Sequence, residues 1–226
     1  MGILSWFLNE PSRTPKSTFV FADGNRLTPR DFGYGLLRFS HEPARELFES
    51  CFGEGGPGPL LPGGALIAAN PFVAHLYLTA LYVGSYLAYV RFVLKVSDVV
   101  LGEVDGGLSR GLNEILAPDG SVFGSTDQQN LRAVIDLFAQ AVVDDIQKSD
   151  ETDPDVFDPT PSNAAKVAIS VLDGAYRDDD GAMYLVSDAP MLLPHFLRLQ
   201  THLANAPLTV LTLLTKQMKV RLVSAG

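Results

Sequence analysis

Residues 70–101 read NPFVAHLYLTALYVGSYLAYVRFVLKVSDVVL, and this stretch decides the fold of the chain. Most of it lies in a gap between Glu54 and Arg91 that contains no Asp, Glu, Lys or Arg. Asn70 suits an N-cap, and Pro71 suits the first helical position because its missing N–H has no helical partner there. No further proline follows before Pro118, so we expect one long helix from residue 70 to about residue 101.

This predicted helix is apolar on every side until Arg91. A helix of that kind is covered either by protein or by lipid. The 19 residues of Phe72–Val90 are uncharged and long enough to span a bilayer, with Arg91 and Lys95 at a suitable cytoplasmic end. The same span contains a histidine, a threonine, a serine and four tyrosines, which are uncommon together in a membrane segment. We therefore favour a buried core helix, with a membrane-embedded helix as the alternative.

The composition is that of an acidic globular protein. The 226 residues are 46% hydrophobic and 19% charged, with a formal net charge of −9, which argues against disorder. Lysine and arginine form no cluster, so the charge that would neutralise phosphates is missing and we expect no nucleic-acid partner. The single cysteine, Cys51, can form no internal disulfide, which favours a cytoplasmic location.

Turn-forming residues divide the chain near its first quarter. Residues 54–64, EGGPGPLLPGG, combine glycines with three prolines and predict a linker. We expect a small N-terminal appendage at residues 1–53 and a helical body at residues 65–226, and one continuous domain fits the same pattern. The appendage contains the apolar Trp6, Phe7 and Leu8, which we expect to dock on the core or on a second subunit. A membrane anchor is the alternative.

Helical patterns fill most of the remaining sequence. In the appendage we expect a short hairpin near residues 18–27 and two helices, at residues 28–39 and 40–52. In the body we expect a break at residues 102–107, where glycines interrupt the apolar pattern, and a short strand at residues 182–186. Further helices are predicted at residues 108–116, 125–146, 160–176, 194–205 and 207–222. The fold is therefore mainly α: a multi-helix bundle around a long central apolar helix, with at most a short N-terminal β-hairpin.

The four histidines do not form a metal-binding motif. His75, His195 and His202 have no acidic residue three or four positions away, and His41 is followed directly by Glu42. Helical bundles hold metals with such spacings, as in Glu-x-x-His. No nucleophile elbow occurs either. We therefore predict no catalytic residue, no metal ligand and no cofactor, and we leave open whether the protein is an enzyme.

Tyr82, Tyr86 and Tyr89 form one stripe of the predicted central helix. Buried tyrosines need partners for their hydroxyl groups, and an apolar pocket with a few polar groups suits a small molecule. Together with His75 and His195, these tyrosines are our candidate ligand-binding residues. The stripe also fits an ordinary core or an oligomer seam, in which the hydroxyls meet backbone carbonyls or water.

These observations favour a non-catalytic interaction or scaffolding module. We expect it to self-associate as a homodimer, because the predicted helices offer more apolar surface than one core requires. The alternative is a binder of an apolar small molecule or lipid in a helical pocket lined by tyrosines. Contact with a membrane is less favoured.

Overall fold

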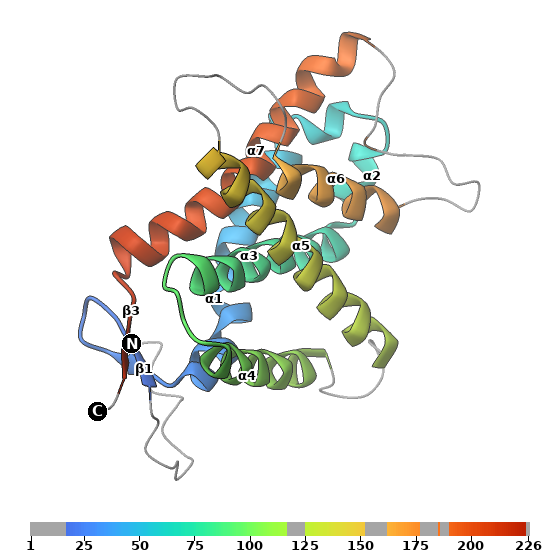
Figure 1. Ribbon diagram of the computed structural model, residues 1–226. Helices are drawn as coiled ribbons and strands as arrows, with labels where there is room; N and C mark the ends of the chain where they lie inside the picture. Colours follow the sequence, from blue (N-terminus) through green and yellow to red (C-terminus); the bar gives the residue numbers. More distant parts are fainter. Residues whose placement is uncertain (1–16, 117–124, 152–161, 177–184, 186–189, 225–226) are drawn as a thin grey trace.

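A computed structural model describes residues 17–116, 125–151, 162–176, 185 and 190–224 (Figure 1). Seven α-helices and a small three-stranded sheet make up this part of the chain, so the prediction of a mainly α fold with a short N-terminal strand pair is confirmed. The apolar Trp6, Phe7 and Leu8 and the predicted strand at residues 182–186, apart from Leu185, lie outside the described residues.

The elements follow one another as β1 (Ser17–Val20), β2 (Arg26–Leu27), α1 (Pro29–Phe52), η2 (Gly58–Leu60), α2 (Gly64–Ala69), α3 (Pro71–Phe92), α4 (Asp98–Leu116), α5 (Ser125–Glu151), α6 (Asn163–Ala175), η3 (Pro190–Leu192), α7 (Leu193–Thr212), η4 (Leu213–Gln217) and β3 (Arg221–Ser224). The elements η2 and η3 are short 3₁₀ turns, and η4 is a π-helical turn that continues α7.

Helix α3 lies in the middle of the molecule and packs against α1, α5, α6 and α7 (Figure 1). Every residue from Leu78 to Val90 is buried except Leu87, which is partly exposed. The helix carries no charged side chain before Arg91, so it needs cover on all sides. Gly84 allows α5 to come close, because a Cβ there would lie 2.8 Å from the backbone oxygen of Ile135.

Helix α3 ends at Phe92, so the prediction of one helix to about residue 101 is wrong at this end. Lys95 adopts a left-handed backbone conformation with φ of 51°, which interrupts the helix. Ser97 then begins α4, and its hydroxyl accepts a hydrogen bond from the N–H of Val100 at 3.5 Å. The apolar period continues across the break because Val96 and Val100 are buried as well. The spacing of apolar residues alone therefore concealed the boundary.

Helix α4 runs through residues 102–107 without the predicted break. Gly107 serves packing instead, because α1 and α4 meet backbone to backbone there. A Cβ on Gly107 would lie 1.8 Å from the backbone oxygen of Arg30, and a Cβ on Gly33 would lie 1.9 Å from that of Val104. Each glycine in a helix costs about 1 kcal/mol relative to alanine. The close approach of the two helices offsets that cost, so tertiary packing overrides the local preference.

Two prolines lie inside helices rather than at the predicted boundaries. Residues 29–52 form the single helix α1 around Pro43, and residues 193–212 form the single helix α7 around Pro207. A proline in a helix removes one backbone hydrogen bond. Both helices pack against α3, and these contacts support each of them as one continuous helix. The predicted division of each segment into two helices is therefore wrong.

The sheet has the order β2-β1-β3. The predicted hairpin forms, with Phe19 opposite Leu27 in an antiparallel pair. Strand β3 adds to the other edge of β1 and places Leu222 opposite Phe19. This strand replaces the end of the helix that we predicted to reach residue 222. Lys219, with φ of 46°, turns the chain after η4, and the N–H of Ala22 donates to the backbone oxygen of Met218 at 2.8 Å.

Residues 54–64 fold into a compact turn that contains η2 and contacts α1 and α7. Gly55 and Gly63 have positive φ values of 78° and 70°, where side chains are disfavoured. The backbones of Gly58 and Gly64 also touch, since a Cβ on Gly64 would lie 1.8 Å from the oxygen of Gly58. Helix α1, in the proposed appendage, packs against α3 and α4 in the proposed body. The division at residues 54–64 stays a prediction.

One carboxylate joins α5 to α6. Asp145 of α5 accepts hydrogen bonds from the N–H groups of Asn163 at 2.7 Å and Ala164 at 3.0 Å. Ser162 accepts a third, from Ala165 at 3.1 Å. The first N–H groups of a helix have no partner within it, and a negative charge there also suits the helix dipole. Asp145 therefore fixes α6 against the C-terminal half of α5.

Helix α3 is the one described helix that is long and apolar enough to cross a bilayer. Within this protein, 72% of its apolar window is buried by other parts of the chain. Burial by companion helices is the arrangement that we expected for a core helix.

The glycines of α4 provide a test of the backbone contact between α1 and α4. We expect Gly107→Ala to destabilise the protein by about 1–3 kcal/mol, because the added methyl group forces the helices apart. Gly102→Ala is the matched control on the same helix, since a Cβ there has open space around it. We expect this control to stabilise α4 by up to about 1 kcal/mol. Urea denaturation followed by circular dichroism measures both changes, and equal effects would contradict the packing role of Gly107.

Candidate functional site

The tyrosine stripe lies in the core between α3 and its neighbours. Tyr82, Tyr86 and Tyr89 are all buried, and Tyr86 is 1% exposed. Burial raises the pKa of Tyr82 and of Tyr86 to about 12. The hydroxyl of Thr209 on α7 partly offsets the raised pKa of Tyr82, while the pKa of Tyr89 is raised by burial and by Asp145. The stripe therefore faces α7 at one end and α5 at the other.

His75 lies on the same helix as the tyrosines, two turns before Tyr82, and packs against α1. Its ring meets the edge of the Phe48 ring at a centroid distance of 4.3 Å. Its buried Nε2 atom has no hydrogen-bond partner among the described residues. Burial lowers the pKa of His75, and the charges of His41 and Arg45 act in the same direction. The ring is therefore held in its neutral form at neutral pH.

His195 lies in the first turn of α7, and its buried Nδ1 atom also lacks a partner within the described part of the chain. No contact between His195 and His75 or the tyrosines is recorded among the described residues. The structure thus brings Tyr82, Tyr86 and Tyr89 together on one helix, with His75 nearby. The proposed role of these five residues in ligand binding stays a prediction.

Two surface hollows occur in other places. The larger one, about 450 Å³, lies where α4 and α5 diverge over the C-terminal end of α3, and we call it the α4–α5 groove. Its apolar lining is Leu87, Ala88, Leu101, Ala139 and Val143, together with Gly102. Its polar lining is Arg91, Asp98, Asp105, Arg132, Asp136 and Gln140. The groove therefore has an apolar floor and charged sides.

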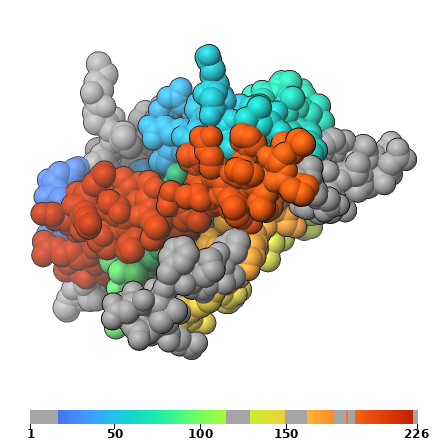
Figure 2. Space-filling model, turned by 90° about the horizontal axis from the view of Figure 1, so that it is seen from above, coloured from blue at the N-terminus to red at the C-terminus, as the bar shows by residue number. Residues whose placement is uncertain are grey.

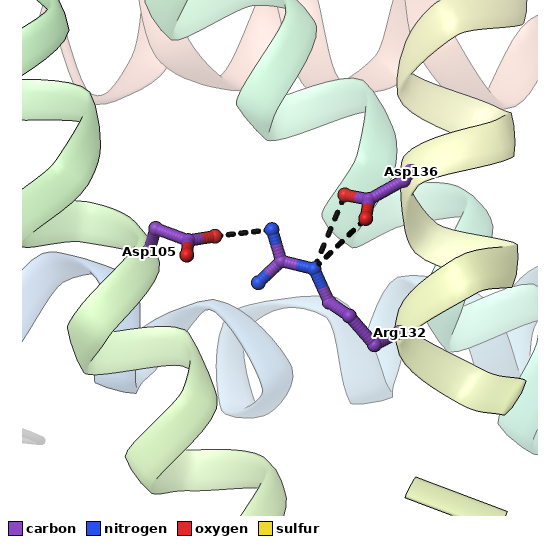
Figure 3. A network of polar contacts seen from close by, with 3 residues as sticks. All are labelled: Asp105, Arg132 and Asp136. Atoms are coloured by element: carbon purple, nitrogen blue, oxygen red, sulfur yellow. Dashed lines mark hydrogen bonds and ion pairs between the residues drawn. The ribbon is translucent and has the colours of Figure 1, made fainter. Parts of the chain in front are cut away.

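Arg132 bridges the two sides of this groove (Figure 3). Its Nε atom lies 3.1 Å and 3.2 Å from the two carboxylate oxygens of Asp136, one turn further along α5. A terminal guanidinium nitrogen pairs with Asp105 of α4. Burial opposes the charge of Arg132, but the two carboxylates outweigh it and raise the pKa of Arg132. α4 and α5 make little direct contact elsewhere, so this ion pair links helices that otherwise stand apart.

A second feature is the outward side of α7. Five of the residues that it exposes follow steps of three or four, so they share one side of the helix, which we call the α7 face: Leu193, Leu197, Thr201, Asn205 and Leu208. Pro194, Arg198 and Thr209 are exposed beside this series. Figure 2 shows α7 along the surface with the η2 and α2 region beside it, and η2 contacts α7. That region exposes Leu60 and Leu66 in addition.

The smaller hollow, about 300 Å³, continues the α7 face into η4. Its lining contains no charged side chain: Asn205, Leu208, Thr209, Thr212, Leu213 and Gln217. Several of the threonines on α7 bond to their own helix, as Thr209 does to the backbone oxygen of Asn205 at 3.1 Å. The outward side of α7 is therefore apolar or neutral for most of its length.

Possible metal ligands and the single thiol can be located in the part of the chain that the structure describes. No group of three His, Cys, Asp or Glu residues gathers there to hold a metal ion. Cys51 is fully buried in α1, and burial raises the pKa of its thiol to about 12. A thiol held in its protonated form is a poor nucleophile.

No protein-family model, no characterised protein and no solved structure matches this chain. The candidate sites therefore depend on the geometry of this molecule alone.

Apolar periodicity in the sequence indicated neither of these surface features. The α4–α5 groove depends on where α3 ends, and that boundary was predicted too late. For the α7 face, a signal was present in the sequence: Asp188 is the last acidic residue, and the remaining 38 positions contain neither Asp nor Glu. A helix that buries one side and carries no acid on the other is unusual in a chain with a net charge of −9.

His75 gives the structure a dependence on pH that can be measured. Its pKa in the folded state is lowered, whereas an unfolded histidine has a pKa of about 6.5. Below about pH 6.5 the unfolded state binds more protons than the folded state. The free energy of unfolding is therefore highest above about pH 6.5 and decreases as the pH falls. We expect His75→Gln to reduce the loss of unfolding free energy between neutral and acidic pH. Urea titrations of both proteins across this range measure it, and parallel slopes would contradict the assignment.

Proposed function

We propose that this protein is a non-catalytic interaction module that self-associates through the α7 face. The proposal depends on the location of the large exposed apolar side chains. Most of the large ones among the described residues belong to α7 and the elements near it: Leu60, Leu66, Phe72, Met191, Leu193, Leu197 and Leu208. Large apolar side chains exposed on neighbouring elements are typical of interaction sites.

The energetics favour covering this surface. Removing a leucine side chain from water contributes about 1.5–3 kcal/mol. Leu193, Leu197 and Leu208 are about half exposed, so each retains a large part of that contribution for an interface. Stable interfaces bury about 800 Å² on each partner. A helix face of five turns, with η2 and α2 beside it, is an extended surface of the type that such interfaces use.

The proposal is tested with two leucines of equal exposure. Leu197 on the α7 face and Leu137 on α5 are both 49% exposed. We expect wild-type protein to show a mass that rises with concentration in sedimentation equilibrium. Leu197→Ser should weaken this association at least about tenfold, the effect of about 1.4 kcal/mol. Leu137→Ser should leave it unchanged. A wild-type protein that stays monomeric up to its solubility limit would overturn the proposed function.

A second candidate function is the binding of an apolar small molecule beside the tyrosines. The observation in its favour is the buried Nε2 atom of His75, which has no partner among the described residues although it lies close to Phe48 and in the same helix as Tyr82. A ligand hydroxyl or amide could pair with it. Native mass spectrometry of freshly purified protein should then show a bound mass that is lost in a His75→Phe variant. An unmodified mass for the wild type would count against this function.

A further inference from the structure

The charge of the chain is divided unevenly between the C-terminal segment that contains α7 and the residues that precede it. The residues after Asp188 carry Arg198, Lys216, Lys219 and Arg221 and no acid, so their formal charge is +4, while the preceding residues carry −13. All four basic side chains are exposed. Arg198 follows Leu197 directly, and Lys216 lies in η4 beside the hollow at the end of the α7 face. The α7 face is therefore apolar with basic flanks.

This charge argues against a symmetric pair in which two α7 faces meet. In such an interface the same patch occurs on both sides, so the basic flanks of one copy face those of the other. Like charges at about 4 Å repel by about 1 kcal/mol in water and by more in a partly dry interface. The α7 face is better suited to a surface with apolar side chains between carboxylates.

The α4–α5 groove is a surface of that type on the same molecule. Its floor is apolar, as the α7 leucines require. Three aspartates line it, and a fourth, Asp144, accepts a hydrogen bond at 2.7 Å from Gln140 of the lining. Arg132 pairs with Asp105 and Asp136, and Arg91 is the second arginine of the lining. The four aspartates and two arginines therefore leave the groove with a net formal charge of −2. A Cβ on Gly102 meets nothing within 4 Å, so the groove is open at α4.

We infer that self-association is head to tail: the α7 face of one copy docks in the α4–α5 groove of a second copy. The inference rests on the proposed function and adds which two surfaces meet. Leucines enter the apolar floor, while Arg198 and Lys216 approach the aspartates. Because the two surfaces differ and lie on different elements, each copy keeps one free surface after the first contact. Assembly then continues beyond a dimer, as a ring or an open chain, and weakens as salt screens the charges.

A complementation experiment separates this arrangement from a symmetric one. One variant, Arg198→Glu with Lys216→Glu, reverses the flanks of the α7 face and leaves the groove intact. The other, Gly102→Arg, places a long cationic side chain in the groove and leaves the α7 face intact. Lys166→Glu and Gly174→Arg, at exposed positions of α6 outside both surfaces, are the matched controls, since a Cβ on Gly174 also meets nothing within 4 Å. Circular dichroism and thermal unfolding establish that all variants are folded before their masses are measured.

We expect wild type and both controls to form species larger than a dimer. Each disrupting variant alone should be monomeric, and a mixture of the two should form a one-to-one heterodimer and nothing larger, because only one competent pair of surfaces remains. If Gly102→Arg associates like wild type, or if the mixture forms no heterodimer, the head-to-tail inference is overturned while self-association through α7 stands. If wild type is monomeric, the proposed function itself fails.

Discussion

The fold depends on shielding helix α3 from water on all sides, because no side of this helix is charged before Arg91. Helix α3 runs for five turns before its first charged residue, Arg91, and most of its surface is apolar. α1, α5, α6 and α7 lie against it in turn, and the places where they approach most closely are marked by small residues such as Gly84. Four of the other six described helices therefore bury an apolar face against the same helix, α3. The sides of these helices that do not contact α3 can then take part in interactions with other molecules.

Much of this architecture could be predicted from the sequence, because a long uncharged stretch and amphipathic periods are strong signals. The boundaries were harder for identifiable reasons. Val96 and Val100 keep the apolar period in phase across a break set by Lys95 and Ser97. Gly107 reads locally as a helix breaker, yet it is where two backbones touch. The first boundary is set by local backbone geometry that apolar spacing does not encode. The second contact joins distant parts of the chain, and a window of neighbouring residues does not contain it.

The candidate sites show the same contrast. The stripe of Tyr82, Tyr86 and Tyr89 follows from helical spacing, and the structure places all three in the core. No short stretch of sequence predicts the α4–α5 groove. It forms because α4 diverges from α5 after α3 ends, while the ion pair of Arg132 with Asp105 keeps the two helices linked. The α7 face lies between these extremes. Its lack of acidic residues can be read directly from the sequence, but its exposure depends on which side the bundle buries.

The pairing of β1 with β3 has a consequence for how the protein reaches its native state. The helices α1 to α7 all lie between these two strands in the sequence, so the sheet cannot close until residues 221–224 have been synthesised. The helical contacts of α1, α3 and α4 join segments much closer in sequence, and such contacts form with a smaller loss of chain entropy. During translation the hairpin of β1 and β2 therefore has one unpaired edge until β3 is made. A polypeptide truncated before residue 221 keeps that edge of β1 exposed, where it can pair with other chains.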